Sequence, residues 1–166
     1  MSQVTIRDKK INTYGNLPET GEKAPHFELV RTDLSTATLK EFKGKRVIMN
    51  IFPSIDTNVC ATSVRNFNER AAKMNNTEVL CISRDLPFAQ KRFVDDEGLN
   101  NVTNLSDFRQ GDFGKDYGVE MIDGPMQGLL SRAVIVLDEE GKVLHSQQVS
   151  DISEEPDYLA ALKPLL

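Results

Sequence analysis

Two apolar segments separated by an amphipathic one constrain the fold of this chain most. Residues 47–52 and 79–83 have the near-continuous hydrophobicity of strands that are covered on both faces. Between them, apolar residues recur three or four positions apart on one face of a helix that we expect to end near residues 75–76; they are Cys60, Val64, Phe67, Ala71 and Met74. The order of strand, helix and strand favours a parallel pair in an α/β sheet.

The remaining segments complete one predicted domain, residues 1–166, whose first residues (1–16) form a β-hairpin extension. The expected elements are hairpin strands at 4–7 and 11–14, a loop at 15–25, extended segments at 27–30 and 36–39, a helix at 87–97, a weak strand at 104–106, a short helix at 112–117, and hairpin strands at 133–137 and 143–147. A last helix, starting at 153–156, is expected to turn Leu159, Leu162 and the two final leucines inward. This order matches a thioredoxin-like fold with an N-terminal extension.

The composition argues against several classes of partner. A net charge of −5 and scattered Lys and Arg disfavour nucleic acid and anionic membrane surfaces. No apolar run approaches the roughly 20 residues of a membrane span, and residues 1–4 open no signal sequence, so we expect a cytoplasmic protein. Two cysteines without a CxxC pair predict neither a metal site nor a disulfide scaffold. His26 and His145 are isolated, and we expect them to be exposed or hydrogen-bonded.

Cys60 stands in the first turn of the predicted helix, beyond the carboxyl end of a buried strand. With Thr57 as N-cap it is the third helical residue, where backbone N–H groups without a partner can stabilise an anion. A helix N-terminus lowers thiol pKa values from about 8.5 to about 3.5–7.5, and a thiol of pKa about 6 is about 90% ionised at pH 7. This placement predicts a nucleophile, whereas Cys81, in the middle of a strand, fits a small buried apolar residue better.

Ionisation alone does not make an efficient catalyst, because charge that moves in the transition state must also be stabilised. The candidate donors are the Thr57 hydroxyl, the N–H groups of the first helical turn, and Arg132. Arg132 stands at the start of a strongly apolar strand, where a half-buried cation is costly without a function. On the pattern alone, a strand-end charge in solvent is an equal alternative for Arg132.

Pro53, Thr57 and Cys60 form the pattern Pro-x-x-x-Thr-x-x-Cys, which resembles the peroxiredoxins. Within them the chain is most similar to the bacterial thiol peroxidases, the atypical two-cysteine group, along nearly its whole length. The segments that carry the resemblance are NIFPSIDTNVCATSVR at 50–65, DLPFAQKRF at 85–93, LSDFR at 105–109 and GLLSRA at 128–133.

The resemblance implies a thioredoxin-dependent peroxidase of thioredoxin-like fold that forms homodimers and reduces hydrogen peroxide and organic hydroperoxides without metal or flavin. By position, Cys60 is the peroxidatic cysteine and becomes a sulfenic acid. Thr57 hydrogen-bonds the thiolate and the substrate, Arg132 holds the thiolate and polarises the peroxide, and Pro53 shields the sulfur from water. Thr57 also stands where a thioredoxin carries the first cysteine of its CxxC motif, which excludes ordinary dithiol exchange.

One position departs from the family pattern. The resolving cysteine of the family directly follows the phenylalanine that corresponds to Phe93, and here that position is Val94. The family's intramolecular disulfide therefore cannot form. Three explanations stay open: an external thiol such as thioredoxin resolves the sulfenic acid, Cys81 substitutes, or Val94 is an introduced residue that traps one state. A cysteine in the middle of a strand reaches a helix start poorly without local unfolding, which ranks Cys81 last as a resolving thiol.

Two other functions compete with the peroxidase. A hydroperoxide sensor or redox-relay protein would be oxidised once at Cys60 and pass the oxidation to a partner, and the missing resolving thiol motivates this alternative. A thioredoxin-fold binding module would carry an inert Cys60.

Overall fold

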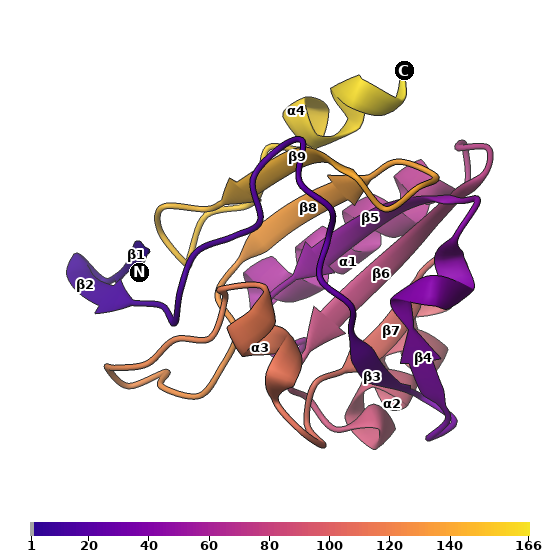
Figure 1. Ribbon diagram of the computed structural model, residues 1–166. Helices are drawn as coiled ribbons and strands as arrows, with labels where there is room; N and C mark the ends of the chain where they lie inside the picture. Colours follow the sequence, from indigo (N-terminus) through magenta and orange to yellow (C-terminus); the bar gives the residue numbers. More distant parts are fainter. Residues whose placement is uncertain (1) are drawn as a thin grey trace.

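The computed structural model describes residues 2–166, which form a seven-stranded sheet with helices and a separate two-stranded hairpin (Figure 1). The strands are β1 (Gln3–Ile6), β2 (Lys9–Asn12), β3 (Glu28–Arg31), β4 (Thr36–Thr38), β5 (Arg46–Ile51), β6 (Thr77–Ser83), β7 (Thr103–Ser106), β8 (Ala133–Leu137) and β9 (Val143–Gln148). The helices are α1 (Asn58–Ala71), α2 (Pro87–Glu97), α3 (Asp112–Asp116) and α4 (Tyr158–Leu162), with 3₁₀ turns η1 (Leu39–Phe42) and η2 (Lys163–Leu165). Met1, which the predicted extension included, lies outside the described residues.

The strand order in the large sheet is β4-β3-β7-β6-β5-β8-β9. β5 pairs in parallel with β6 and antiparallel with β8, so the predicted parallel pair and the predicted terminal hairpin are both confirmed. Because β5 and β6 run in the same direction, their carboxyl ends meet at one edge of the sheet, and α1 starts beyond that edge.

The sheet is covered on both faces, because side chains along each central strand alternate between two apolar clusters. Along β5, Val47, Met49 and Ile51 join a cluster with Phe113 and Tyr117 in and after α3. The opposite face is covered by α1, α2 and α4; its cluster includes Ile48, Phe52, Cys60, Val64, Phe67, Val134, Val136 and Leu162. Both faces of the middle strands are therefore shielded from solvent, as their near-continuous hydrophobicity predicts.

The N-terminal hairpin is confirmed, but its turn is shorter than the expected residues 8–10 and starts one residue earlier. β1 ends at Ile6, and Arg7 and Asp8 form the turn with φ angles of 48° and 66°. Two-residue hairpin turns with positive φ at both positions favour Asn and Gly, so the Arg-Asp pair gave no signal in the sequence. One side of the hairpin packs on the main fold through Val4 and Ile11, which contact Met121 and Ile152.

The last helix starts later than predicted, and its inward face differs as a result. α4 begins at Tyr158, after an N-cap formed by the Asp157 carboxylate, which accepts a hydrogen bond from the Ala160 N–H at 3.0 Å. With this start, the helical period turns Tyr158, Ala161, Leu162 and Leu165 inward. The inward prediction was therefore wrong for Leu159, which is 74% exposed, and for Leu166.

The helix of Cys60 is also shorter than predicted. α1 ends at Ala71, and Met74 lies beyond it, half-buried against the same apolar cluster.

Candidate active site

The turn that joins β5 to α1 is held by the Asp85 carboxylate, which follows the neighbouring strand β6. Asp85 Oδ1 accepts a hydrogen bond from Ser54 Oγ at 2.8 Å, and Oδ2 accepts from the Ile55 N–H at 2.9 Å and from Ser83 Oγ at 2.6 Å. Asp85 was not among the predicted site residues. Its place just after a strand parallel to β5 was an available signal, because such strand ends meet at one edge.

Cys60 is the third residue of α1, as predicted, with Thr57 at the N-cap. The first bond of the helix runs from the Ala61 N–H to the Thr57 carbonyl oxygen at 3.0 Å. The N–H groups before Ala61 therefore have no carbonyl partner inside the helix. Cys60 packs among apolar side chains that include Phe52 and Val64. Its sulfur thus combines an apolar environment with the positive end of a 14-residue helix.

The Thr57 side chain does not cap the helix. Its Oγ1 donates to the Ser54 carbonyl oxygen at 3.2 Å, inside the turn before α1. Thr57 is exposed, whereas Pro53, in the same turn, is buried. Pro53 therefore lies on the protein side of this turn and Thr57 on its solvent side. The predicted bond from Thr57 to the thiolate needs a rotation of this hydroxyl away from Ser54.

Arg132 is buried, with 2% of its surface exposed, so the alternative of a strand-end charge in solvent was wrong. Its Nε and Nη2 donate to the carbonyl oxygen of Ile152 at 3.0 and 2.8 Å. Its Nη1 is buried and has no hydrogen-bond partner among residues 2–166. A buried N–H of a cation without an acceptor is costly, and it marks a position where an anion or a polar ligand would be stabilised.

The sheet register brings Arg132 to the same end and the same face as Cys60. Ile51 pairs with Ala133 in the antiparallel β5–β8 ladder, so the next pair along places Arg132 opposite Phe52. Arg132 precedes Val134 by two residues, and Val134 belongs to the apolar cluster that contains Cys60 and Phe52. The strands thus direct the guanidinium toward the face that α1 covers, at the edge where α1 begins.

The Cys60 residue has no exposed surface. A residue without exposed surface cannot be touched by a molecule the size of water, and hydrogen peroxide is no smaller. A substrate therefore reaches this sulfur only after part of the surrounding chain moves. On the N-terminal side of Cys60, the nearest exposed residues are Asp56, Thr57 and Asn58, at the end of the turn that Asp85 holds. This turn is therefore the closest exposed segment through which the site can open.

Cys81 is buried in the middle of β6, as predicted for a structural cysteine. Burial raises the pKa of its thiol to about 12, although a hydrogen bond from Asn50 opposes this effect. Asn50 Nδ2 lies 3.8 Å from Cys81 Sγ. Such a thiol is protonated at neutral pH and is a poor nucleophile.

Val94 lies on α2, half-buried against the apolar cluster that contains Cys60. The position of the family's resolving cysteine thus lies on the same face of the sheet as Cys60.

Known proteins resemble this chain over nearly its whole length. The Redoxin family matches residues 19–162. A thiol peroxidase of Mycobacterium tuberculosis is 53% identical over 165 residues, which cover 99% of both chains, and one of Mycobacterium bovis is equally similar. The chain belongs to the thiol peroxidases. A peroxiredoxin-like protein of Aquifex aeolicus has a TM-score of 0.93 at 38% identity, covering 98% of this chain and 95% of the other. A thiol peroxidase of Chromobacterium violaceum has a TM-score of 0.91 at 26% identity, covering 98% and 94%.

Membership of the thiol peroxidases confirms the predicted family and the thioredoxin-like fold. The redox-relay alternative is not favoured, because the relatives named above are peroxidases. The individual roles of Cys60, Thr57, Arg132 and Pro53 stay predictions. All four residues lie at the carboxyl end of β5 or beside it.

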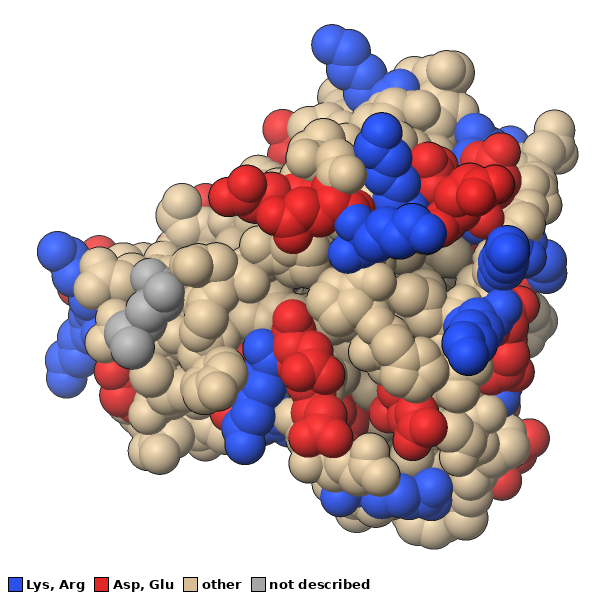
Figure 2. All heavy atoms as spheres, in the orientation of Figure 1, with Lys and Arg blue, Asp and Glu red and all other residues tan. Residues whose placement is uncertain are grey.

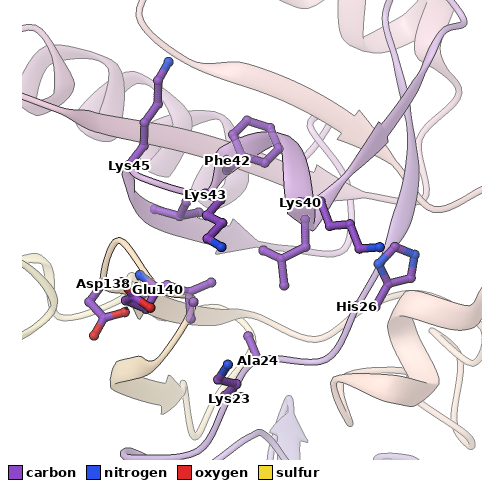
Figure 3. Close-up of a pocket in the computed structure, with 13 residues that line it drawn as sticks. Lys23, Ala24, His26, Lys40, Phe42, Lys43, Lys45, Asp138 and Glu140 are labelled. Atoms are coloured by element: carbon purple, nitrogen blue, oxygen red, sulfur yellow. Dashed lines mark hydrogen bonds between the residues drawn. The ribbon is translucent and has the colours of Figure 1, made fainter.

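A cavity of about 280 Å³ lies beside the first residues of β5, whereas Cys60 follows the other end of that strand; Figure 3 shows residues that line the cavity. Its lining includes Val47, the second residue of β5, and Leu137, the partner of Val47 on β8. Val47 lies roughly 13 Å along the strand from Ile51. Lysines and carboxylates share its rim; they are Lys23, Lys40, Lys43, Lys45, Asp138 and Glu140. The cavity holds no cysteine, and we do not assign it to this thiol peroxidase chemistry.

The rest of the described surface carries charges of both signs. On the face shown in Figure 2, Lys and Arg alternate with Asp and Glu and do not form one large patch of a single sign. Within residues 2–166, no group of three His, Cys, Asp or Glu is arranged to hold a metal ion. Over the same residues, no helix has the length and hydrophobicity needed to cross a membrane. His26 is exposed as predicted, but His145 is half-buried, and its Nε2 lacks a partner in the described chain.

Proposed function

We propose that this chain reduces hydroperoxides with Cys60 as the peroxidatic thiol. The observation that supports the assignment most is the placement of Cys60 at the start of α1, at the sheet end where the buried Arg132 has an unused N–H. Membership of the thiol peroxidases makes peroxide the substrate that this pair of groups fits.

The reaction that we propose is a displacement at oxygen. The Cys60 thiolate attacks the terminal oxygen of the hydroperoxide, an S–O bond forms, and the O–O bond breaks. The terminal oxygen keeps its proton and becomes the sulfenic acid Cys60–SOH, while the other oxygen leaves as an alkoxide that takes one proton from solvent. The sulfur loses two electrons, and the peroxide gains them. Donors around the leaving oxygen lower the barrier, because negative charge moves there in the transition state.

Arg132 is the main candidate donor. Its Nη1 has no partner and its guanidinium is fixed through the other nitrogens, so it is oriented before substrate arrives. The N–H groups of the first turn of α1 are a second set of donors. Thr57 joins them when its hydroxyl turns from Ser54, and the buried Pro53 keeps water from the sulfur.

Recycling is proposed to depend on an external dithiol such as thioredoxin, or on a small thiol. Val94 removes the resolving cysteine of the family, and the buried, protonated Cys81 is a poor substitute. The first external thiol attacks the sulfenic sulfur and releases water, and a second thiol then reduces the mixed disulfide. Dependence on such reductants fits a reducing compartment, and we propose that the protein acts in the cytoplasm.

A homodimer is proposed from the family resemblance, and exposed apolar residues supply a surface for it. Leu86 and Phe88, at the start of α2, and Phe108, after β7, are 52%, 67% and 40% exposed. The two segments meet, because Ser106 Oγ donates to the Asp85 carbonyl oxygen. Sedimentation equilibrium of the wild type and of Phe88→Asp tests this proposal, which predicts a dimer and a monomer respectively.

The peroxidase proposal is tested by stopped-flow mixing of the reduced protein with hydrogen peroxide or cumene hydroperoxide. We expect rapid sulfenic acid formation at Cys60, no reaction in Cys60→Ser, and an unchanged rate in the matched control Cys81→Ser. Arg132→Met is expected to slow the reaction by about 100-fold, the usual loss for one preorganised donor. A wild-type rate no faster than that of free cysteine would reject the proposal and favour an inert binding module.

A further inference from the structure

The Arg132 guanidinium is fixed by one peptide group that lies far away in the sequence. Arg132 Nε and Nη2 both donate to the Ile152 carbonyl oxygen, at 3.0 and 2.8 Å. The Ile152 peptide belongs to the segment between β9 and α4, outside the sheet. The direction of the remaining nitrogen, Nη1, therefore depends on where this irregular segment lies.

The N-terminal hairpin holds that segment in place through Thr5. The Ile152 N–H donates to the Thr5 carbonyl oxygen at 3.0 Å, and the Thr5 N–H donates to the Ser150 carbonyl oxygen at 2.8 Å. The Thr5 hydroxyl donates to Asp151 Oδ2 at 2.7 Å. Thr5 thus binds three successive residues, 150–152, and the last of them carries the carbonyl that Arg132 uses.

Apolar contacts support the same connection. The Ile152 side chain is buried in a small cluster with Val4 and Ile11 of the hairpin and Met121 of the main fold. Val4 and Ile11 are cross-strand partners, so both strands of the hairpin pack on the residue whose peptide binds Arg132. The N–H and the side chain of Ile152 thus both contact this hairpin.

We propose that the N-terminal hairpin is a positioning element of the active site, in which Thr5 fixes the Ile152 peptide and this peptide aims Arg132. The inference rests on the proposed role of Arg132 in peroxide reduction. A fixed carbonyl holds the guanidinium in one orientation before substrate arrives, and a misplacement of about 1 Å at a reacting group can cost about 100-fold in rate.

The test removes the Thr5 hydroxyl and restores it. Thr5→Val loses the bond to Asp151, and Thr5→Ser keeps it. We expect the second-order rate constant of Cys60 with hydrogen peroxide to fall about fivefold in Thr5→Val and to stay within about twofold in Thr5→Ser. Gln3→Ala is the matched control. It removes a hydrogen bond within the hairpin, from Gln3 Nε2 to Asn12 Oδ1 at 3.1 Å, and leaves the contact of Thr5 with residues 150–152 intact. Equal rates in Thr5→Val and wild type would overturn the proposal.

A double-mutant cycle separates positioning from general weakening of the fold. In an Arg132→Met background, Thr5→Val should change the peroxide rate by less than about twofold, because the group that it positions is absent. The same fivefold loss in both backgrounds would show that Thr5 acts on the fold and not through Arg132, and would overturn the proposal. Urea unfolding of each variant verifies that the measured protein is folded.

A readout without peroxide distinguishes this inference from the proposed function. The exchange rate of the Arg132 Nε proton with water, measured by NMR, should rise at least about fivefold in Thr5→Val and stay near the wild-type value in Gln3→Ala. If the wild type fails as a peroxidase, this measurement still decides whether Thr5 fixes Arg132. An unchanged exchange rate contradicts the connection through Ile152.

Discussion

Asn50 of β5 donates from Nδ2 to the Ser63 hydroxyl of α1 at 3.1 Å, and Ser63 donates in turn to the Cys60 carbonyl oxygen at 2.8 Å. Both side chains are fully buried. The same Asn50 amide lies 3.8 Å from the sulfur of Cys81. One amide of β5 thus connects α1, the helix that carries Cys60, with the neighbouring strand β6.

Ser63→Ala should lower the free energy of unfolding by about 1–3 kcal/mol, because it leaves the buried Asn50 amide without its closest acceptor. Urea unfolding measures this change. Thr62→Ala is the matched control, since the exposed Thr62 hydroxyl also donates to a carbonyl of its own helix, that of Asn58, at 2.8 Å. Its effect should stay within about 0.5 kcal/mol. Equal losses in the two variants would contradict a special role for the buried bond.

Val94→Cys should restore an intramolecular disulfide, because Val94 packs against the apolar cluster that contains Cys60. After treatment of this variant with one equivalent of peroxide, peptide mass spectrometry should detect a disulfide between Cys60 and the introduced cysteine, and turnover with thioredoxin should rise. The same treatment of the wild type should give a sulfenic acid or its overoxidation products. A Cys60–Cys81 disulfide in the wild type would show that Cys81 acts as a resolving thiol after all.

Arg84→Met should lower the free energy of unfolding by about 3–5 kcal/mol, because two poorly exposed carboxylates lose their cation. Arg84 contacts Asp107 at 3.2 Å and Glu120 at 2.6 Å, and burial already raises the pKa of Asp107. The matched control is Lys91→Met, which removes an exposed ion pair with Asp95 at 2.8 Å and should cost less than about 0.5 kcal/mol. A similar midpoint of urea unfolding for both variants would refute the difference.

Stability should fall as the pH drops below about 7, in part through His145. Burial lowers the pKa of His145 below 6.5, although Asp157 acts in the opposite direction. Between its folded-state pKa and 6.5, the unfolded chain binds a proton that the folded chain does not, so stability rises with pH in that window and is lost as pH falls through it. Urea unfolding at a series of pH values should give a shallower slope in His145→Gln. An identical slope would exclude His145 as a source.

The apolar runs carried most of the information about the fold. Strands β5, β6 and β8 have nearly continuous hydrophobic runs, because both of their faces are covered, and their positions could be read within one or two residues. Polar elements with weak local signals were placed less well. The hairpin turn at Arg7 and Asp8 lacks the usual glycine or asparagine, and the start of α4 depends on the Asp157 cap more than on Pro156.

Candidate site residues could be predicted where the side chain itself has distinctive chemistry, as for Cys60 at a helix start and Arg132 before an apolar strand. A contact was not predictable where the partner is a backbone atom. The Ile152 carbonyl that binds Arg132 has no signature in the sequence, because every residue carries the same group. Asp85 was missed for another reason, since its hydrogen bonds with Ser54 and Ile55 arise only once β5 and β6 are adjacent.

Complete enclosure of the Cys60 sulfur turns access into a kinetic step of its own. With Cys60 as the proposed peroxidatic thiol, the oxidation rate should grow in proportion to peroxide concentration at low peroxide and level off at high peroxide, at the frequency with which the protein uncovers the thiol. The ceiling would be the same for small and bulky hydroperoxides that use one opening. Such gating would also limit how fast the proposed sulfenic acid meets a second oxidant molecule, and so would slow its irreversible overoxidation.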